Sequence, residues 1–288
     1  MGRWGAGLYA DDKAADLRQS IALIATIPAP GDRLLEILLR QAGRTPELTD
    51  SDGCTFWLVI ADQFERRGIR CDTVLERASA AIDRERHHGE IGKSTLDQLA
   101  KRLRSPRPER TRPRSPKRRQ HVVRVGDVYA FRTMAGLPFG TYIRSAADLN
   151  RRNFVPDGWG VIVIVDLGRA FEWIPWCAVA SVAVDPSEPP VLDAVTSGEL
   201  LYHAQTHGAT RCIPKRSELK DVGFQLLGTL SLDPIRAQTV VADWPSAEES
   251  VELGWPIKSV TFGRNCRFAP SLPSGPRLST LVTRRTAH

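Results

Sequence analysis

The sequence predicts an α+β protein with two domains, an all-α helical bundle over residues 1–100 and an antiparallel β-rich domain over residues 121–288. The first hundred residues carry apolar side chains at helical spacing, interrupted by glycine or proline. From residue 121 the pattern changes to β-branched and aromatic runs bounded by glycine, proline and aspartate. Between them, residues 101–120 form a basic linker rich in proline and arginine. The length of 288 residues also favours two domains.

Five helices are expected in the first half, and all but the third have a nearby residue that can accept from the free N–H groups of a first turn. Asp11 or Asp12 can cap the first helix, and Pro28 and Pro30 end it. We assign the later starts to Asp32, Thr55, Asp72 and Ser94, and the ends of the second and third helices to Gly43 and Gly68.

The linker holds most of the positive charge of the chain. Residues 101–119 contain ten Lys or Arg and one Glu, a local charge of +9, whereas the whole chain carries +7. Four prolines forbid a continuous helix or strand, and the like charges repel one another, which predicts an extended, solvated tether. It could bind nucleic acid through phosphate contacts, attract an acidic partner, or serve only as a tether.

Seven strands are expected in the second half, where the run VIVIV at residues 161–165 is too apolar for an exposed strand and should lie at the centre of a sheet. A short helix capped by Ser197 is expected over residues 197–208. The domain should be a barrel-like or sandwich structure, with an SH3-like barrel as one form. The expected strands are 122–131, 139–145, 159–167, 171–184, 222–232, 257–264 and 279–285.

A motif opens the chain, with Trp4, Gly5 and Gly7 followed by Asp12 and Asp16. It resembles the bacterial domain of unknown function that begins M-G-x-W-G-x-G-x-F-x-N-D-x-A-x-D-W, which implies a helical domain over residues 1 to about 100, sometimes encoded beside toxin-immunity genes. The chain departs from that pattern at Tyr9, Ala10 or Asp11, and Leu17. From the residues alone, the glycines permit a tight turn and the two aspartates favour capping or solvation over metal or acid–base chemistry.

A second motif opens the β-rich half, with Gly126-Asp127 in the first expected strand and Phe139-Gly140 in the next. It resembles a bacterial immunity-protein family whose members start k-x-G-D-v-f-a-i-p-l and continue y-g-f-G-r-i, although Thr141 stands where Arg is usual. The resemblance covers residues 121–235. It implies a β-rich domain that binds and neutralises a cognate toxin without catalysis.

The same strand also resembles the start of ribonuclease toxins with SH3-like barrels, which is the alternative. Such an enzyme needs a cation near the phosphate and a hydroxyl or acid beside it. The sequence offers Arg132 with Thr133, or Arg144 with Ser145. The later strands of the toxin pattern are not apparent, so the residues favour a protein without catalysis.

No metal or cofactor is expected, because the five cysteines are widely spaced and the pair His203 and His207 lacks a third ligand. Neither a secretory signal nor an apolar stretch of membrane-spanning length is present, which predicts a cytoplasmic protein. We therefore expect a bacterial immunity or interaction protein that occludes a cognate toxin or effector. Most tryptophans should be core, and the candidate partner-binding residues are Trp159, Trp173, Trp176, Arg132 and Arg144.

Overall fold

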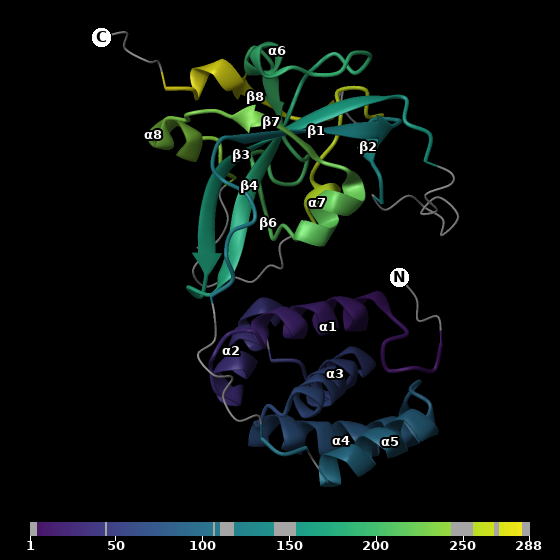
Figure 1. Ribbon diagram of the computed structural model, residues 1–288. Helices are drawn as coiled ribbons and strands as arrows, with labels where there is room; N and C mark the ends of the chain where they lie inside the picture. The colour runs from purple at the N-terminus through teal and green to yellow at the C-terminus, as the bar shows by residue number, and fades with distance from the viewer. Residues whose placement is uncertain are drawn as a thin grey trace. The chain divides into compact units, whose positions relative to one another are not determined.

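The protein is α+β, with a helical part followed by a part built on an antiparallel sheet (Figure 1). The computed structural model describes residues 5–43, 45–105, 107–109, 118–140, 154–242, 256–267 and 271–283. Its internal contacts divide the chain into two compact units, which we call the helical unit and the β unit. The helical unit contains α1 (Asp12–Ile24), α2 (Gly31–Ala42), α3 (Ser51–Arg67), α4 (Asp72–His88) and α5 (Lys93–Arg104).

Within the helical unit, α1 and α3 begin at aspartate caps. Asp11 accepts a hydrogen bond from the N–H of Ala14 at 3.2 Å, as the sequence predicted, and Asp50 accepts from Gly53 at 2.5 Å. Helix α3 therefore begins before Thr55. The three other predicted caps are wrong, because the cap positions of α2, α4 and α5 are held by Pro30, Cys71 and Gly92. The predicted glycine ends are confirmed: Gly43 and Gly68 have φ of 68° and 64°.

Helix α3 is the central helix of its unit. Nearly every side chain from Gly53 to Glu65 is buried, and α3 contacts α1, α4 and α5. A helix that is apolar on all sides is stable only when neighbours surround it, so polar groups within it must find partners. Helix α5 ends at Arg104, so the first residues of the predicted linker are helical.

The β unit is built on an eight-stranded antiparallel sheet that does not close. Its strands follow the order β2-β1-β3-β4-β5-β8, with β6 beside β4 and β7 beside β1. The strands are β1 (Asp127–Met134), β2 (Leu137–Pro138), β3 (Gly158–Ala170), β4 (Ile174–Val182), β5 (Glu199–Leu201), β6 (Thr210–Cys212), β7 (Gln225–Thr229) and β8 (Ser274–Arg277). The short helices are α6 (Leu192–Thr196), α7 (Arg216–Val222) and α8 (Pro234–Gln238).

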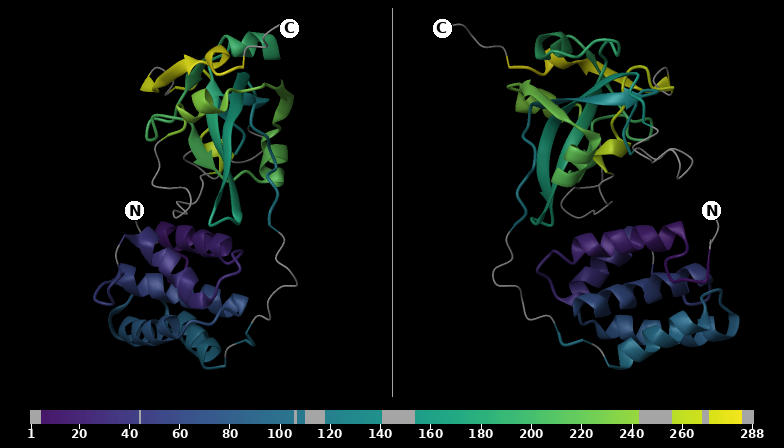
Figure 2. Two further views of the ribbon diagram at one scale, coloured as in Figure 1. Left: turned by 90° about the vertical axis from the view of Figure 1, so that its left-hand side faces the viewer. Right: turned by 45° about the vertical axis from the view of Figure 1, so that its right-hand side comes forward.

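Strand β3 lies at the centre of the sheet, as the VIVIV run predicted. Val163 pairs with Val128 of β1 on one side and with Ala180 of β4 on the other. Alternate residues then face two hydrophobic clusters, the first around Val161, Val163 and Val165 and the second around Ile162 and Ile164. Helix α6 packs on the first cluster and α7 on the second, so both faces of the sheet are covered, as Figure 2 shows.

Several local predictions for the β half are wrong. The expected helix 197–208 is replaced by β5 and turns, because Leu200 and Leu201 pair with β4 and β8. Ser197 instead follows the end of α6. The expected strands 257–264 and 279–285 contain the 3-10 turns Ile257–Ser259 and Leu278–Thr280. The first strand begins at Asp127 rather than residue 122, and most of the expected strand 139–145 lies outside the described residues.

Candidate functional site

Two of the predicted partner-binding residues meet on the sheet. Arg132 of β1 and Trp159 of β3 are cross-strand neighbours, and the guanidinium carbon lies 4.5 Å from the centroid of the indole ring. Trp159 is half-buried and packs against the first cluster with its other atoms. A cation on a tryptophan face at this distance is attracted by the ring quadrupole. The pair therefore presents a guanidinium whose position is fixed by the core beneath it.

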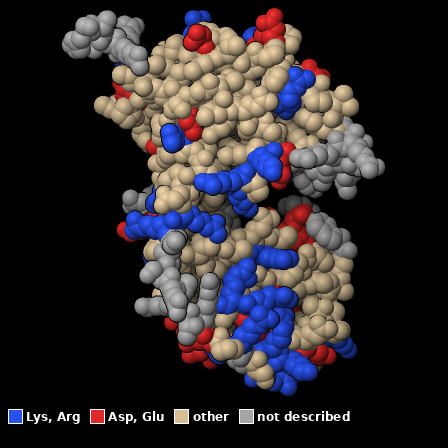
Figure 3. Space-filling model, viewed as in Figure 1, with Lys and Arg blue, Asp and Glu red and all other residues tan. Residues whose placement is uncertain are grey.

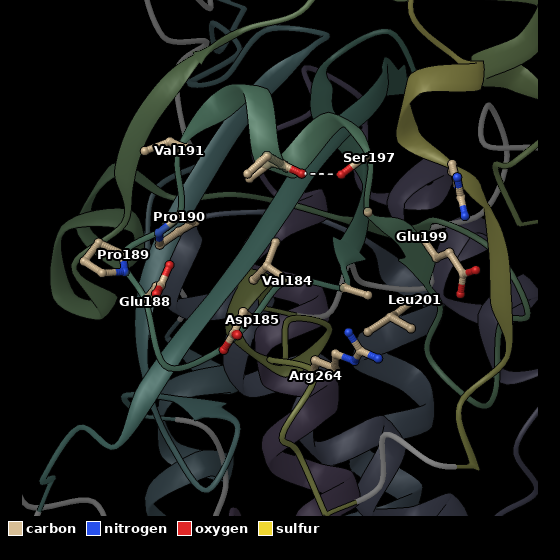
Figure 4. A pocket seen from close by; sticks show the side chains of 15 residues that line it. Val184, Asp185, Glu188, Pro189, Pro190, Val191, Ser197, Glu199, Leu201 and Arg264 are labelled. Atoms are coloured by element: carbon tan, nitrogen blue, oxygen red, sulfur yellow. Dashed lines mark hydrogen bonds between the residues drawn. The ribbon is translucent and has the colours of Figure 1, made fainter.

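An open pocket of about 650 Å³ is lined by neither residue of this pair, but one of its loops is hydrogen-bonded to Trp159. The backbone N–H of Trp159 donates to the carbonyl of Pro186 at 3.0 Å, which ties strand β3 to the loop of residues 185–191. That loop supplies one end of the pocket, which we call the 185–191 pocket. Figure 4 shows Pro189, Pro190 and Val191 at this end, with Glu199 and Leu201 at the other. The candidate site therefore combines a stacked Arg–Trp pair with a pocket of mixed charge whose loop is bonded to the backbone of Trp159.

The 185–191 pocket carries both signs of charge. Asp185 accepts from the hydroxyl and the N–H of Ser187 at 2.6 and 2.9 Å, and these bonds, with the charge of Arg264, lower the pKa of Asp185. Val191 is 62% exposed, so the rim offers apolar surface to solvent. The charged lining residues are Asp185, Glu188, Glu199, Arg264 and Arg277.

The other nominated residues lie elsewhere. Trp176 packs against the first cluster, and the Arg211 guanidinium stacks on its ring at 4.6 Å. Trp173 is half-buried and closes the β3–β4 turn, with its N–H donating to the carbonyl of Ala170 at 3.0 Å. Trp4 and Arg144 lie outside the described residues. The structure thus brings Arg132 and Trp159 together and separates them from Trp173 and Trp176 along the sheet register.

The Gly126-Asp127 motif builds the turn into the first strand. Asp127 is buried and accepts from the N–H of Arg124 and the hydroxyls of Thr229 and Tyr129, at 2.8, 2.8 and 3.1 Å. Gly126 has φ of 84°, and a Cβ there would lie 1.9 Å from the Leu230 carbonyl oxygen. Burial, followed by the Asp127 carboxylate, raises the pKa of Tyr129 to about 12. The motif therefore joins β1 to the end of β7.

The remaining residues of the two sequence motifs lie in turns, in packing contacts or on the surface of α1. Phe139 packs edge-to-face on Phe154 with 5.5 Å between ring centroids, and Gly140 has φ of 75°. Gly5 and Gly7 lie in an exposed bend before α1. Asp12 and Asp16 are exposed on the first turns of α1, and burial, then the charges of Asp12 and Asp11, raises the pKa of Asp16.

The candidate catalytic residues Arg132 and Thr133 lie on opposite faces of β1, because they are successive residues of that strand. The Thr133 hydroxyl is buried and has no hydrogen-bond partner among the described residues. Within the same part of the chain, no three His, Cys, Asp or Glu side chains are grouped as metal ligands would be. His203 and His207 lie in turns rather than on a helix.

A second polar cluster, which sequence reasoning missed, lies in the helical unit. Asp62 of α3 is 1% exposed and accepts from the Tyr9 hydroxyl, from Arg102, and from Nε of Arg66 at 2.8 Å. Glu65, one turn along, accepts from Arg102 at 3.2 Å. Burial and then Asp62 raise the pKa of Tyr9. The available signal was the near-continuous apolar run of α3, in which a carboxylate must be paired.

Comparison of the chain with models of known protein families, with curated proteins and with solved structures found no match. Among the described helices, none combines the length and the apolar character that crossing a bilayer requires.

Proposed function

We propose that this protein is a non-catalytic bacterial immunity-type protein that binds a cognate toxin or effector and covers its active surface. The observation that carries the proposal is the stacked Arg132–Trp159 pair, whose Trp159 is hydrogen-bonded to the loop of the 185–191 pocket. Tryptophan and arginine are the residues most often responsible for binding energy at protein interfaces. Because the core and the neighbouring strand already hold this pair, little side-chain entropy is lost when a partner binds.

The chemistry of the site suits a protein surface. Arg132 makes no ion pair with a described carboxylate, so it can receive one from a partner. The 185–191 pocket adds carboxylates, guanidiniums and an apolar rim within one open hollow. Several side chains of a protein partner can pair with these charges and contact the apolar rim at the same time. Binding of this kind neutralises a toxin by occlusion, without any bond made or broken.

The sequence resemblances support the same proposal from each half of the chain. The proposal treats the two units as domains joined by residues 101–120, and the β unit as SH3-like, both of which stay predictions. It also assigns the protein to the cytoplasm, where a bacterial toxin produced by the same cell or delivered by a neighbour would act.

Co-expression of the full chain with the product of the neighbouring gene, followed by calorimetry, tests the proposal. Trp159→Ala should weaken binding by about thirtyfold or more, because an anchor of this kind contributes about 2 kcal/mol. Arg132→Ala should weaken it about tenfold. Arg124→Ala is the matched control, since it removes an exposed arginine with no described side-chain contact from the same unit, and it should change the affinity less than twofold.

Two results would contradict the proposal. One is a neighbouring product that is not retained, or is retained equally by Trp159→Ala and wild type. The other is cleavage of RNA by the purified protein that disappears in Arg132→Ala, which would establish the ribonuclease alternative instead.

A further inference from the structure

Arginines from three helices, from the α3–α4 connection and from the chain after α5 gather on one face of the helical unit. Figure 3 shows Lys and Arg side chains gathered over α1, α3 and α5. Direct contacts connect them: Arg18 lies 5.0 Å from the centroid of the Tyr9 ring, Tyr9 bonds to Asp62, and Arg107 pairs with Glu65 at 3.5 Å. We call this set the arginine face, and its members are Arg18, Arg66, Arg67, Arg70, Arg102 and Arg107.

The two carboxylates at the centre of the arginine face form ion pairs with three of its arginines. Asp62 and Glu65 are 1% and 4% exposed, and between them they pair with Arg66, Arg102 and Arg107. The three arginine side chains remain 53%, 32% and 63% exposed. The buried carboxylates bind Arg66 and Arg107 through Nε, and they bind Arg102 through both terminal nitrogens, while part of each arginine side chain reaches solvent. Arginine, with five N–H donors in a planar fork, can serve two acceptors in this way.

Three arginines of the face have only neutral partners among the described residues. Arg18 stacks on Tyr9, Arg67 donates to Gln63, and Arg70 donates to the carbonyl of Arg107 at 3.0 Å. Six guanidiniums against two carboxylates leave four positive charges uncompensated within this set. Burial lowers the pKa of Arg67, and the charges of Arg18 and Arg66 act in the same direction. A bound anion would relieve this repulsion.

Helix stability explains only part of the arrangement. Arg66 and Arg67 lie in the last turn of α3, where cations favourably oppose the helix dipole. Arg18 lies in the middle of α1, and Arg107 follows α5, so neither position has that explanation. Arg102 and Arg107 also belong to the basic segment 101–119, which is therefore anchored on α3 at its start rather than solvated from its first residue.

We propose that the arginine face binds the phosphate backbone of nucleic acid without reading its sequence. The face is polar throughout, and the one aromatic ring that we assign to it, Tyr9, is covered by Arg18. Protein interfaces need an apolar centre, whereas nucleic-acid interfaces are polar and strongly positive. Guanidinium forks held in fixed orientation match phosphate oxygens with two parallel bonds. This activity is separate from toxin binding by the β unit.

The test measures fluorescence anisotropy of the full chain with two labelled probes of mixed sequence, a single-stranded RNA and a duplex DNA of about 30 nucleotides or base pairs. Each lost phosphate contact should cost about eightfold in affinity for duplex DNA at about 0.1 M salt and reduce the salt slope by about 0.9. Arg18→Ala/Arg67→Gln leaves Asp62 and Glu65 paired, and it should therefore bind about sixtyfold more weakly with a slope reduced by nearly two. The two probes distinguish RNA from DNA as the physiological source of phosphate.

Arg33→Ala/Arg40→Ala is the matched control, because it removes the same charge from α2, where both arginines pair with Glu36. It should change the affinity less than twofold. If the double variant loses its thermal transition, Arg18→Ala alone, at an exposed side chain, should still lose about eightfold. The proposal is overturned by no binding of either probe at about 50 mM salt, or by an unchanged affinity and slope in the Arg18 variants. Competition by poly-glutamate at equal charge would also overturn it, in favour of an acidic protein partner.

Discussion

The buried carboxylate of Asp62 allows a quantitative test of the helical unit. Its side chain is 1% exposed and bonds to Tyr9, Arg66 and Arg102, which come from the N-terminal segment, α3 and α5. Asp62→Ala leaves the Tyr9 hydroxyl and two guanidiniums without this acceptor. Removing one partner of a buried pair costs about 3 to 5 kcal/mol, and we take about 3 because both guanidiniums reach solvent. That cost lowers the ratio of folded to unfolded protein by about two orders of magnitude.

Urea unfolding of the full chain, followed by far-ultraviolet circular dichroism, measures this cost. Asp52→Ala is the matched control, since it removes a carboxylate of the same helix that is 65% exposed and that pairs, within the described part of the chain, with Lys13 alone. It should change the free energy of unfolding by less than about 0.5 kcal/mol. Equal effects of Asp62→Ala and Asp52→Ala would refute the reasoning.

The lowered pKa of the same carboxylate predicts a pH dependence of stability. Burial alone would raise the pKa of Asp62, but hydrogen bonds from Tyr9, Arg102 and Arg66 outweigh it and the pKa is lowered. A lowered folded pKa stabilises the protein above the unfolded value, near pH 4, and the contribution is lost as the pH falls through the folded value. The stability difference between wild type and Asp62→Asn should therefore be constant above about pH 4 and shrink below it. A difference that grows in acid would contradict this assignment.

Two further outcomes are expected. Gly126→Ala should destabilise the β unit by more than about 3 kcal/mol, because φ is 84° and the new Cβ would meet the Leu230 carbonyl. Gly223→Ala, at φ of 78° with no atom within 4 Å, should cost only about 1 to 2 kcal/mol. Urea unfolding of both variants, followed by tryptophan fluorescence, measures the two costs. Trypsin should cut first within residues 110–119 and later at Arg102 and Arg107, because these two arginines are paired with Glu65. Mass spectrometry of the early fragments tests this order of cleavage. Early cleavage at Arg102, or cleavage scattered over the chain, would contradict the prediction.

Local chemistry determined much of what could be predicted from the sequence. The Asp11 cap and the left-handed glycines Gly43 and Gly68 involve neighbours a few residues away, so their signals are readable in the chain. The central place of residues 161–165 follows from composition, since a strand apolar on both faces must be covered on both. The same local reasoning failed at residues 197–208, where pairing with β4 and β8 overrode helical spacing.

Only the tertiary structure decided which side chains work together. The Arg132–Trp159 pair depends on the register of β1 against β3, and one residue of slip would place the two side chains on opposite faces. Asp62 meets residues 53 and 40 positions away, Tyr9 and Arg102, across the packing of α3. The sequence by itself therefore determined two units, their secondary-structure classes and a basic segment between them. Long-range packing determined the sites, because charges and rings far apart in the chain become neighbours only when the core has formed.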